Sequence, residues 1–142
     1  MRYVRGDFYT LDEAIAYGIR PQLKLSDEDE ERWEVYVKLV SGTRVVFASG
    51  GTRKQAGKAL LRMLRLIKLP TKYLMSTLDD SFVDPQKVVR VYMDGQDNQH
   101  VGLVEDVCGE SYHIAIGSKA EVYRVVMEAT KAVASIQSKG EL

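Results

Sequence analysis

Six cations lie between Arg53 and Lys68, a stretch that contains no acidic residue. At about 100° per residue, an α-helix through this stretch would carry five of them along one side and its apolar residues along the other. The glycine-rich turn just before it, Gly50-Gly51, leaves backbone amides and the positive end of the helix dipole open to an anion. This pattern favours contact with phosphate groups. The five cations are Lys54, Lys58, Arg62, Arg65 and Lys68.

Two other interpretations of the basic stretch stay open. In the first, its cations simply face solvent. In the second, they pair with an acidic run, Asp27–Glu31, within the chain or in a neighbouring copy. Between Ser26 and Glu34 six carboxylates accompany a single cation, Arg32. The two signs of charge are therefore segregated along the chain, although its formal net charge is zero.

No catalytic or metal-binding motif accompanies these charges. His100 and His113, the only histidines, each fall on a predicted strand with no metal ligand at a familiar spacing. Cys108 lies in a predicted turn, and the sequence places no base beside it. We therefore expect no catalytic residue, no metal and no cofactor. A small enzyme would need four scattered side chains to gather in one cleft: Asp79, Asp84, Asp94 and His100.

The composition predicts a globular, cytoplasmic protein. Of the 142 residues, 45% are hydrophobic and 28% are charged, as in ordinary globular domains. The single cysteine excludes an intramolecular disulfide framework and fits a reducing compartment. The chain has no apolar run of about 18 residues that would span a membrane, and its first residues lack the apolar core of a signal peptide.

The elements that must position the basic helix are predicted from periodicity and turn signals. A capping box opens a short helix, Thr10–Tyr17, which Gly18 ends. The basic helix itself runs from about Arg53 to Leu69, where Pro70 stops it. Between the two helices, alternating apolar residues and turn signals predict three strands. These strands are Gln22–Leu25, Trp33–Val40 and Thr43–Ser49.

The second half repeats this order of elements after a linker over residues 71–86. The helix caps, Thr52 and Ser118, lie 66 residues apart, and the middle strands begin 67 residues apart, at Trp33 and His100. The predicted fold is α+β, with two βββα units in which one long helix covers an antiparallel sheet. The short helix precedes the first unit (residues 1–70), and the second occupies residues 87–142. The second unit's elements are strands Lys87–Met93, His100–Val107 and Ser111–Ile116 and a helix over Lys119–Gln137.

Two segments of the first half carry a family resemblance. An alternating strand, Trp33-Glu34-Val35-Tyr36-Val37, precedes the helix opening Ala48-Ser49-Gly50-Gly51-Thr52-Arg53-Lys54-Gln55-Ala56-Gly57-Lys58. They are similar to a Phe-x-Val-x-Val strand and to a Gly-x-Gly-x-Ser-Lys-Lys-x-Ala-Lys motif, so residues 10–69 resemble a double-stranded RNA-binding domain. That family recognises duplex RNA by shape. The resemblance implies that four residues bridge phosphates: Thr52, Arg53, Lys54 and Lys58.

Two segments depart from the family pattern. The loop that enters the minor groove in that family holds Asp27–Glu31 here, and phosphates would repel it. The first helix of that family is also longer than Thr10–Tyr17 allows. We expect a non-enzymatic protein that binds double-stranded RNA or other structured nucleic acid, and no membrane. The alternative is a protein-association module that joins copies through the basic helix and the acidic loop, and a small enzyme is a remote alternative. The candidate nucleic-acid-binding residues are Thr52, Arg53, Lys54, Lys58, Arg62 and Arg65.

Overall fold

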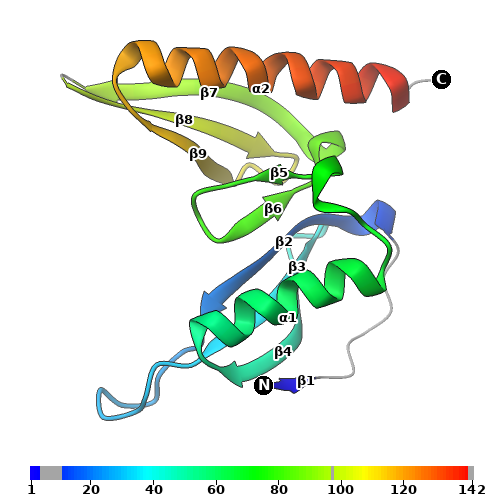
Figure 1. Cartoon of the computed structure of the whole chain (residues 1–142), viewed down its shortest axis with the longest axis vertical. Coiled ribbons are helices and arrows are strands. Elements are labelled where there is room, and N and C mark those ends of the chain that lie inside the picture. Colours follow the sequence, from blue (N-terminus) through cyan, green and yellow to red (C-terminus); the bar gives the residue numbers. More distant parts are fainter. Residues whose placement is uncertain (4–10, 97, 141–142) are drawn as a thin grey trace.

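The computed structural model describes residues 1–3, 11–96 and 98–140. In this part of the chain the first sheet has six antiparallel strands, in the order β1-β4-β3-β2-β6-β5 (Figure 1). Helix α1 (Arg53–Leu66) covers one face of this sheet. The strands are β1 (Arg2–Tyr3), β2 (Ala14–Pro21), β3 (Trp33–Leu39), β4 (Arg44–Gly51), β5 (Met75–Ser76) and β6 (Ser81–Val83).

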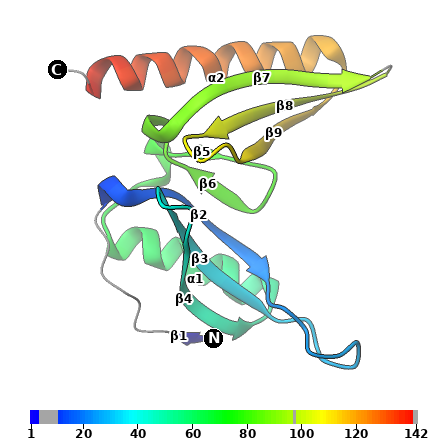
Figure 2. The same ribbon diagram turned by 180° about the vertical axis from the view of Figure 1, so that it is seen from behind.

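The second sheet has three antiparallel strands, β7 (Val88–Gln96), β8 (Gln99–Asp106) and β9 (Ser111–Gly117). Helix α2 (Lys119–Gly140) lies across it, as Figures 1 and 2 show from opposite sides. We call each sheet with its helix a lobe. The predicted α+β class with two antiparallel sheets is confirmed. Short 3₁₀ turns lie at Leu11–Glu13, Thr71–Tyr73 and Pro85–Lys87.

Strand β2 is the shared wall of the two lobes. Its residues Ala14 to Ile19 are all buried. Tyr17 and Ile19 pack in the core beneath α1, whereas Ile15 and Ala16 pack in a second core with the other lobe. A β-strand turns successive side chains to opposite faces, so one strand can serve two cores. A register shift between Ala14 and Ala16 interrupts this alternation, so Ile15 lies in the second core together with Ala16 and not with Tyr17. The other buried residues of the second core are Val83, Val88, Val104, Tyr112 and Val133.

The predicted short helix over Thr10–Tyr17 is wrong. Only Leu11–Glu13 form a helical turn, and β2 begins at Ala14; the predicted cap at Thr10 lies outside the described residues. The predicted strand Gln22–Leu25 is wrong too, because this segment belongs to an irregular, mostly exposed loop. Both errors have one source: the buried strand lies about eight residues earlier than periodicity placed it.

The first lobe is larger than the predicted βββα unit. Strands β2, β3 and β4 and helix α1 do follow one another, but β1, β5 and β6 enlarge the sheet. Residues 71–86, which we expected as a linker, supply β5 and β6, and β6 pairs with β2. The β3–β4 hairpin, the three strands of the second lobe and both long helices form as predicted, although α1 ends at Leu66.

The hairpin formed by β5 and β6 also reaches the second lobe. While β6 pairs with β2, the backbone N–H of Leu78 at the tip donates to the His113 carbonyl of β9 at 2.7 Å. The His113 N–H in turn donates to the Asp79 carboxylate at 2.6 Å. The hairpin therefore joins both sheets, and it covers part of the free edge of β9.

Gly18 sits where β2 passes closest to its neighbours, and we expect Gly18→Ala to destabilise the fold. An added Cβ would lie 2.6 Å from the Tyr36 hydroxyl oxygen and 2.9 Å from Ser81 Cβ. The Tyr36 ring cannot yield easily, because the guanidinium groups of Arg20 and Arg44 stand 5.3 and 5.2 Å from its centroid. Overpacking of this kind costs about 1–3 kcal/mol, which urea unfolding would measure.

The matched control for this prediction is Gly57→Ala in α1. A Cβ at Gly57 meets nothing within 4 Å, and alanine stabilises a helix interior by up to about 1 kcal/mol relative to glycine. Equal stability of the two variants would contradict the close packing at Gly18.

Candidate nucleic-acid interface

Helix α1 begins at a capping box, as predicted. Thr52 Oγ1 accepts a hydrogen bond from the Gln55 N–H at 3.2 Å, and Gln55 Oε1 accepts one from the Thr52 N–H at 2.9 Å. These two bonds satisfy donors that a helix start would otherwise leave without partners. Thr52 therefore fixes where the helix starts and how it is oriented. The buried face of α1 consists of Ala56, Ala59, Leu60, Met63 and Leu64.

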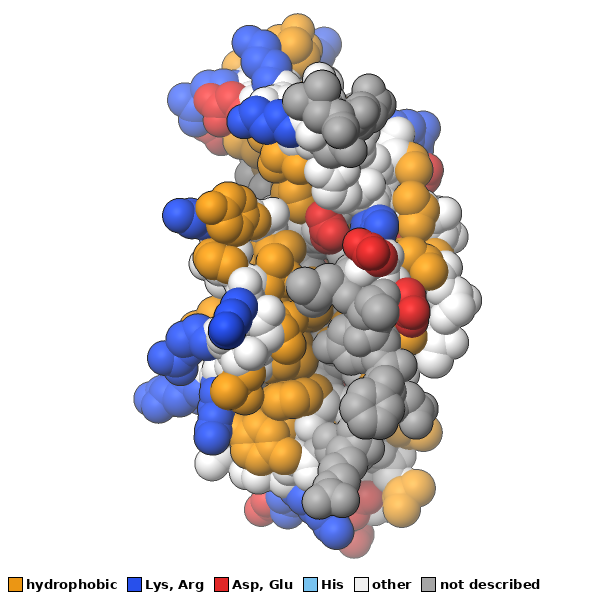
Figure 3. Space-filling model, turned by 90° about the vertical axis from the view of Figure 1, so that its right-hand side faces the viewer, with side chains coloured by type: hydrophobic (Ala, Val, Ile, Leu, Met, Phe, Trp, Pro, Cys, Tyr) orange, Lys and Arg blue, Asp and Glu red, His pale blue; other side chains and the backbone are white. Residues whose placement is uncertain are grey.

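The opposite side of α1 carries a line of exposed cations. Lys58, Leu61 and Arg65 follow Lys54 at intervals of four, three and four residues, which aligns them along the helix. Lys68 follows just after the helix end, and we call these five residues the basic face. None of its four cations forms an ion pair with a residue that the structure describes. In Figure 3, Lys and Arg side chains gather along one edge of the lower lobe, on the side of α1.

The structure places Arg53 apart from the basic face. Its guanidinium Nη2 contacts both carboxylate oxygens of Asp80, at 2.8 and 2.9 Å, and lies over the ring of Trp33. Asp80 comes from the β5–β6 hairpin, so this pair joins α1 to the sheet edge. Arg53 and Lys54, expected from the sequence as a pair of phosphate ligands, thus have different surroundings.

Arg62 lies at the flank of the basic face. Its guanidinium stands 5.5 Å from the centroid of the Tyr3 ring, which itself packs edge-on against Phe47. The contact holds the Arg62 side chain toward β1 while its charge remains exposed. Of the six predicted residues, the structure therefore aligns Lys54, Lys58 and Arg65, puts Arg62 beside them, and gives Thr52 and Arg53 contacts within the fold.

Shallow grooves flank the basic face on both sides of Leu61. One, of about 670 Å³, runs along the C-terminal half of α1 with Leu69 and Pro70 in its lining and Arg65 and Lys68 beside them. The other, of about 430 Å³, lies between α1 and the β5–β6 hairpin, where Lys54, Lys58 and Phe82 contribute to the lining. The cations thus stand beside partly apolar surface.

The acidic run lies on a projecting loop, residues 22–32 between β2 and β3, which we call the acidic hairpin. Its base is tied to β4, because Gln22 Oε1 accepts from the Gly50 N–H at 2.8 Å and Arg32 donates to the Gly50 carbonyl at 3.0 Å. Figures 1 and 2 show it pointing away from both lobes. The acidic run forms one ion pair with its own neighbour, Arg32 with Glu30 at 3.9 Å, and no described residue of it pairs with the basic stretch of the same chain.

A second charged arrangement, which the sequence did not predict, lies between the lobes. Lys38 of β3 is 3% exposed, and its Nζ donates to Asp106 at 2.7 Å and to Glu110. Arg44 Nη2 donates to the two oxygens of Glu110 at 2.7 and 2.9 Å. The Tyr112 hydroxyl donates to Asp106, which is fully buried, at 2.7 Å. We call these five residues the interlobe cluster.

The interlobe cluster fixes the protonation of its members. Burial alone would lower the pKa of Lys38, but hydrogen bonds to Asp106 and Glu110 outweigh this effect and raise it. Burial raises the pKa of Tyr112, and its bond to Asp106 raises that pKa further. Tyr36 lies beside the cluster, against Arg44, and burial raises its pKa too, against the lowering effect of nearby cations. All three groups therefore keep their protons more strongly in the folded protein than in the unfolded chain.

These shifts predict that the protein loses stability in alkali. Above about pH 10 the unfolded chain releases protons that folded Tyr36, Lys38 and Tyr112 retain, so the free energy of unfolding falls as the pH rises. Each retained proton contributes a slope of about 1.4 kcal/mol per pH unit. Urea unfolding at a series of pH values measures the slope, and Tyr112→Phe should make it shallower. Stability that stays constant through this range would contradict the assignment.

The charged side chains that line the cleft between the lobes are all paired among the described residues, although the buried Nε of Arg44 has no hydrogen-bond partner there. The cleft encloses about 610 Å³ and is lined by charged residues from both lobes. Arg20 pairs with Glu34 at 2.8 Å, and Asp79 pairs with His113 at 3.2 Å. Arg44 and Glu110 pair with each other, and Asp80 pairs with Arg53.

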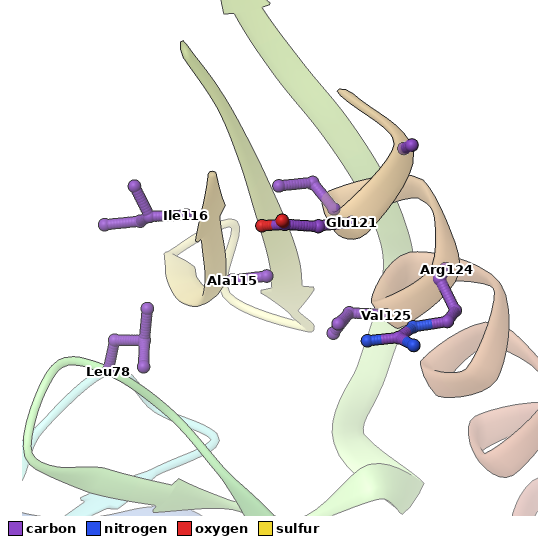
Figure 4. A pocket seen from close by; sticks show the side chains of 8 residues that line it. Leu78, Ala115, Ile116, Glu121, Arg124 and Val125 are labelled. Carbon is purple, nitrogen blue, oxygen red and sulfur yellow. The ribbon is translucent and has the colours of Figure 1, made fainter. Parts of the chain in front are cut away.

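A more apolar hollow of about 680 Å³ lies beside β9 and the start of α2 (Figure 4). Leu78 approaches it from the β5–β6 hairpin, and Ala115 and Ile116 line it from β9. Glu121 and Arg124 of α2 are its charged residues. Two side chains of opposite sign do not make a convergent set of polar groups, so the hollow is a weaker candidate for a functional site than the basic face.

Other candidate chemistry is dispersed. Asp84 caps the 3₁₀ turn Pro85–Lys87, and Asp94 accepts a bond from its neighbour Gly95. The described residues include no group of three His, Cys, Asp or Glu side chains that could hold a metal ion. No helix in the described ranges has an apolar stretch long enough to cross a membrane.

Comparison with protein-family models, with curated proteins and with solved structures finds no match.

Proposed function

We propose that this protein binds structured nucleic acid through phosphate contacts made by the basic face of α1. One observation carries the proposal: Lys54, Lys58 and Arg65 are exposed and aligned on α1, Lys68 is exposed at the same groove as Arg65, and none of the four has a carboxylate partner in the described chain. Like charges on one helix face repel one another. An anionic partner relieves that repulsion, and each contact releases counterions from the nucleic acid.

The extent of the basic face favours a linear polyanion over a small anion. Lys54 and Arg65 are separated by eleven residues of helix, which corresponds to about 16 Å along its axis. A single phosphate group reaches one or two of these cations. A nucleic-acid backbone presents phosphates at regular intervals and reaches all of them.

The chemistry of the face favours a duplex over a single strand. Residues 53–68 include no aromatic side chain, so the line of cations itself offers no stacking platform to unstacked bases; the rings of Tyr3 and Phe82 lie at its flanks. Lysine and arginine contacts to phosphates position a duplex without reading its bases. We therefore expect binding that depends little on base sequence.

Titrations of labelled duplex RNA, duplex DNA and single strands, followed by fluorescence anisotropy, test the proposal. Between about 50 and 200 mM salt, duplex DNA affinity should fall about 40-fold for three phosphate contacts and about 150-fold for four. Failure to bind any of these ligands at low salt would overturn the proposal. Binding that does not change with salt would overturn it as well, because phosphate contacts require counterion release.

A further inference from the structure

We propose that the basic face also receives the acidic hairpin of a second copy of this chain, so that the protein associates with itself. This inference goes beyond the proposed function and does not depend on it. It starts from two exposed surfaces of opposite charge that belong to one chain but do not meet within it. The composition of the two surfaces indicates that they meet between two copies of the chain.

The acidic hairpin carries both charge and apolar surface. Leu23 and Leu25 are 93% and 95% exposed. Three neighbouring carboxylates, Asp27, Glu28 and Glu31, are exposed and form no ion pair with a residue in the described ranges. Two fully exposed leucines beside unpaired carboxylates suit a partner that is both cationic and apolar.

The basic face has the complementary composition. Leu61, 46% exposed, stands between Lys58 and Arg65. The two grooves beside it combine apolar lining with cationic side chains. Leu23 and Leu25 are two residues apart and can occupy this apolar surface while the neighbouring carboxylates approach the lysines and arginines.

The hairpin cannot make these contacts within its own chain. Its bonds to Gly50 hold its base at the end of β4, next to the N-terminus of α1. From there it projects away from the helix instead of along it (Figure 1). Each copy therefore has one hairpin to offer and one face to fill, and a reciprocal exchange between two copies gives a closed, twofold dimer.

The same cations serve both partners, so the two kinds of binding exclude each other. A duplex that contacts Lys58 and Arg65 displaces the hairpin of the second copy, and the dimer hides the surface that a duplex needs. The acidic hairpin in this role imitates a phosphate backbone. Added duplex is thus expected to convert dimers into protein–nucleic acid complexes that contain a monomer.

Sedimentation velocity over a concentration series, at low and high salt, tests the inference. The wild-type protein should sediment as a dimer at low salt and shift toward a monomer at high salt, because screening weakens exposed charge pairs. The hairpin variant Glu28→Lys/Glu31→Lys should be monomeric, and so should the uncharged change Leu23→Ser/Leu25→Ser. The control Glu121→Lys/Glu128→Lys, which makes the same charge change on α2, should remain dimeric. A wild-type protein that is monomeric throughout overturns the inference.

A charge exchange gives the sharpest test. The hairpin variant has a basic hairpin and a basic face, whereas Lys54→Glu/Lys58→Glu/Arg65→Glu has an acidic hairpin and an acidic face, because Lys68 is then the one cation left on that face. Each should be monomeric alone, but the equimolar mixture should form a dimer with both contacts restored. A mixture that stays monomeric overturns the inference. The hairpin variant should still bind duplex, so a failure of self-association is distinguishable from a failure of nucleic-acid binding.

Discussion

Duplex binding should weaken on the order of 100-fold when three charges of the basic face are reversed together, as Lys54→Glu, Lys58→Glu and Arg65→Glu. These residues lie on one line of α1 and have no carboxylate partner in the described chain. Their reversal removes three phosphate contacts and adds repulsion. The slope of affinity against salt should also fall by about three units, one for each lost contact. Fluorescence anisotropy at several salt concentrations measures both quantities.

The matched control reverses three exposed cations of α2, as Arg124→Glu, Lys131→Glu and Lys139→Glu. It changes the net charge of the protein by the same amount but leaves the basic face intact. If both triple variants lose affinity equally, binding depends on overall charge and the assignment to α1 is wrong. Unfolding curves of each variant show whether the fold survives, since all six side chains are exposed.

The interlobe cluster predicts the second large effect, a loss of about 3–5 kcal/mol of stability in Lys38→Met. Methionine fills most of the space of the lysine stem but leaves Asp106 ionised and fully buried. Water cannot solvate that carboxylate, so the folded state bears the cost. Urea unfolding measures the change as a lower midpoint with an unaltered slope.

A second substitution separates the charge effect from the loss of packing. Lys38→Met combined with Asp106→Asn leaves no unpaired charge, and the amide oxygen still accepts from the backbone N–H of Cys108. The double variant should therefore recover part of the lost stability. Recovery would fail if Lys38 acted only through packing. The more exposed pair Arg90–Glu105 offers a contrast, because surface ion pairs contribute at most about 1 kcal/mol.

The sequence predicted local features well because their signals are local. Thr52 and Gln55 lie within one helical turn, so the capping box needs no distant partner to form. The turn between β3 and β4 contains Gly42, whose positive φ of 88° suits a residue without a side chain. The second lobe alternates apolar and polar positions because α2 covers one face of its sheet.

Strand β2 was missed because burial on both faces removes the alternation that identifies a strand. The run from Ala14 to Ile19 is continuously buried, and a short apolar run of this kind is ambiguous between helix and strand. The capping-box residues before it, which begin at Thr10, then favoured the prediction of a helix. Strands β5 and β6, of two and three residues, are too short to give any periodic signal.

Local sequence patterns also predicted the candidate site only in part, because they do not reveal partners that lie far away in the chain. Helical spacing correctly separated the cations of α1 from its apolar face, but it could not show that Arg53 would meet Asp80, 27 residues further on. The partners Lys38 and Asp106 lie 68 residues apart and come from different lobes. Lys38 alternates with Val37 like any surface residue of a half-buried strand, so nothing in its neighbourhood reveals that the second lobe covers it.

Because Ile15 and Ala16 belong to a strand of one lobe and to the core of the other, neither half of the chain has a complete interior of its own. A fragment that begins after residue 86 would expose Val88, Val104 and Tyr112 to water. Proteolysis or recombination that separates the halves should therefore yield fragments that aggregate, instead of two domains that fold independently.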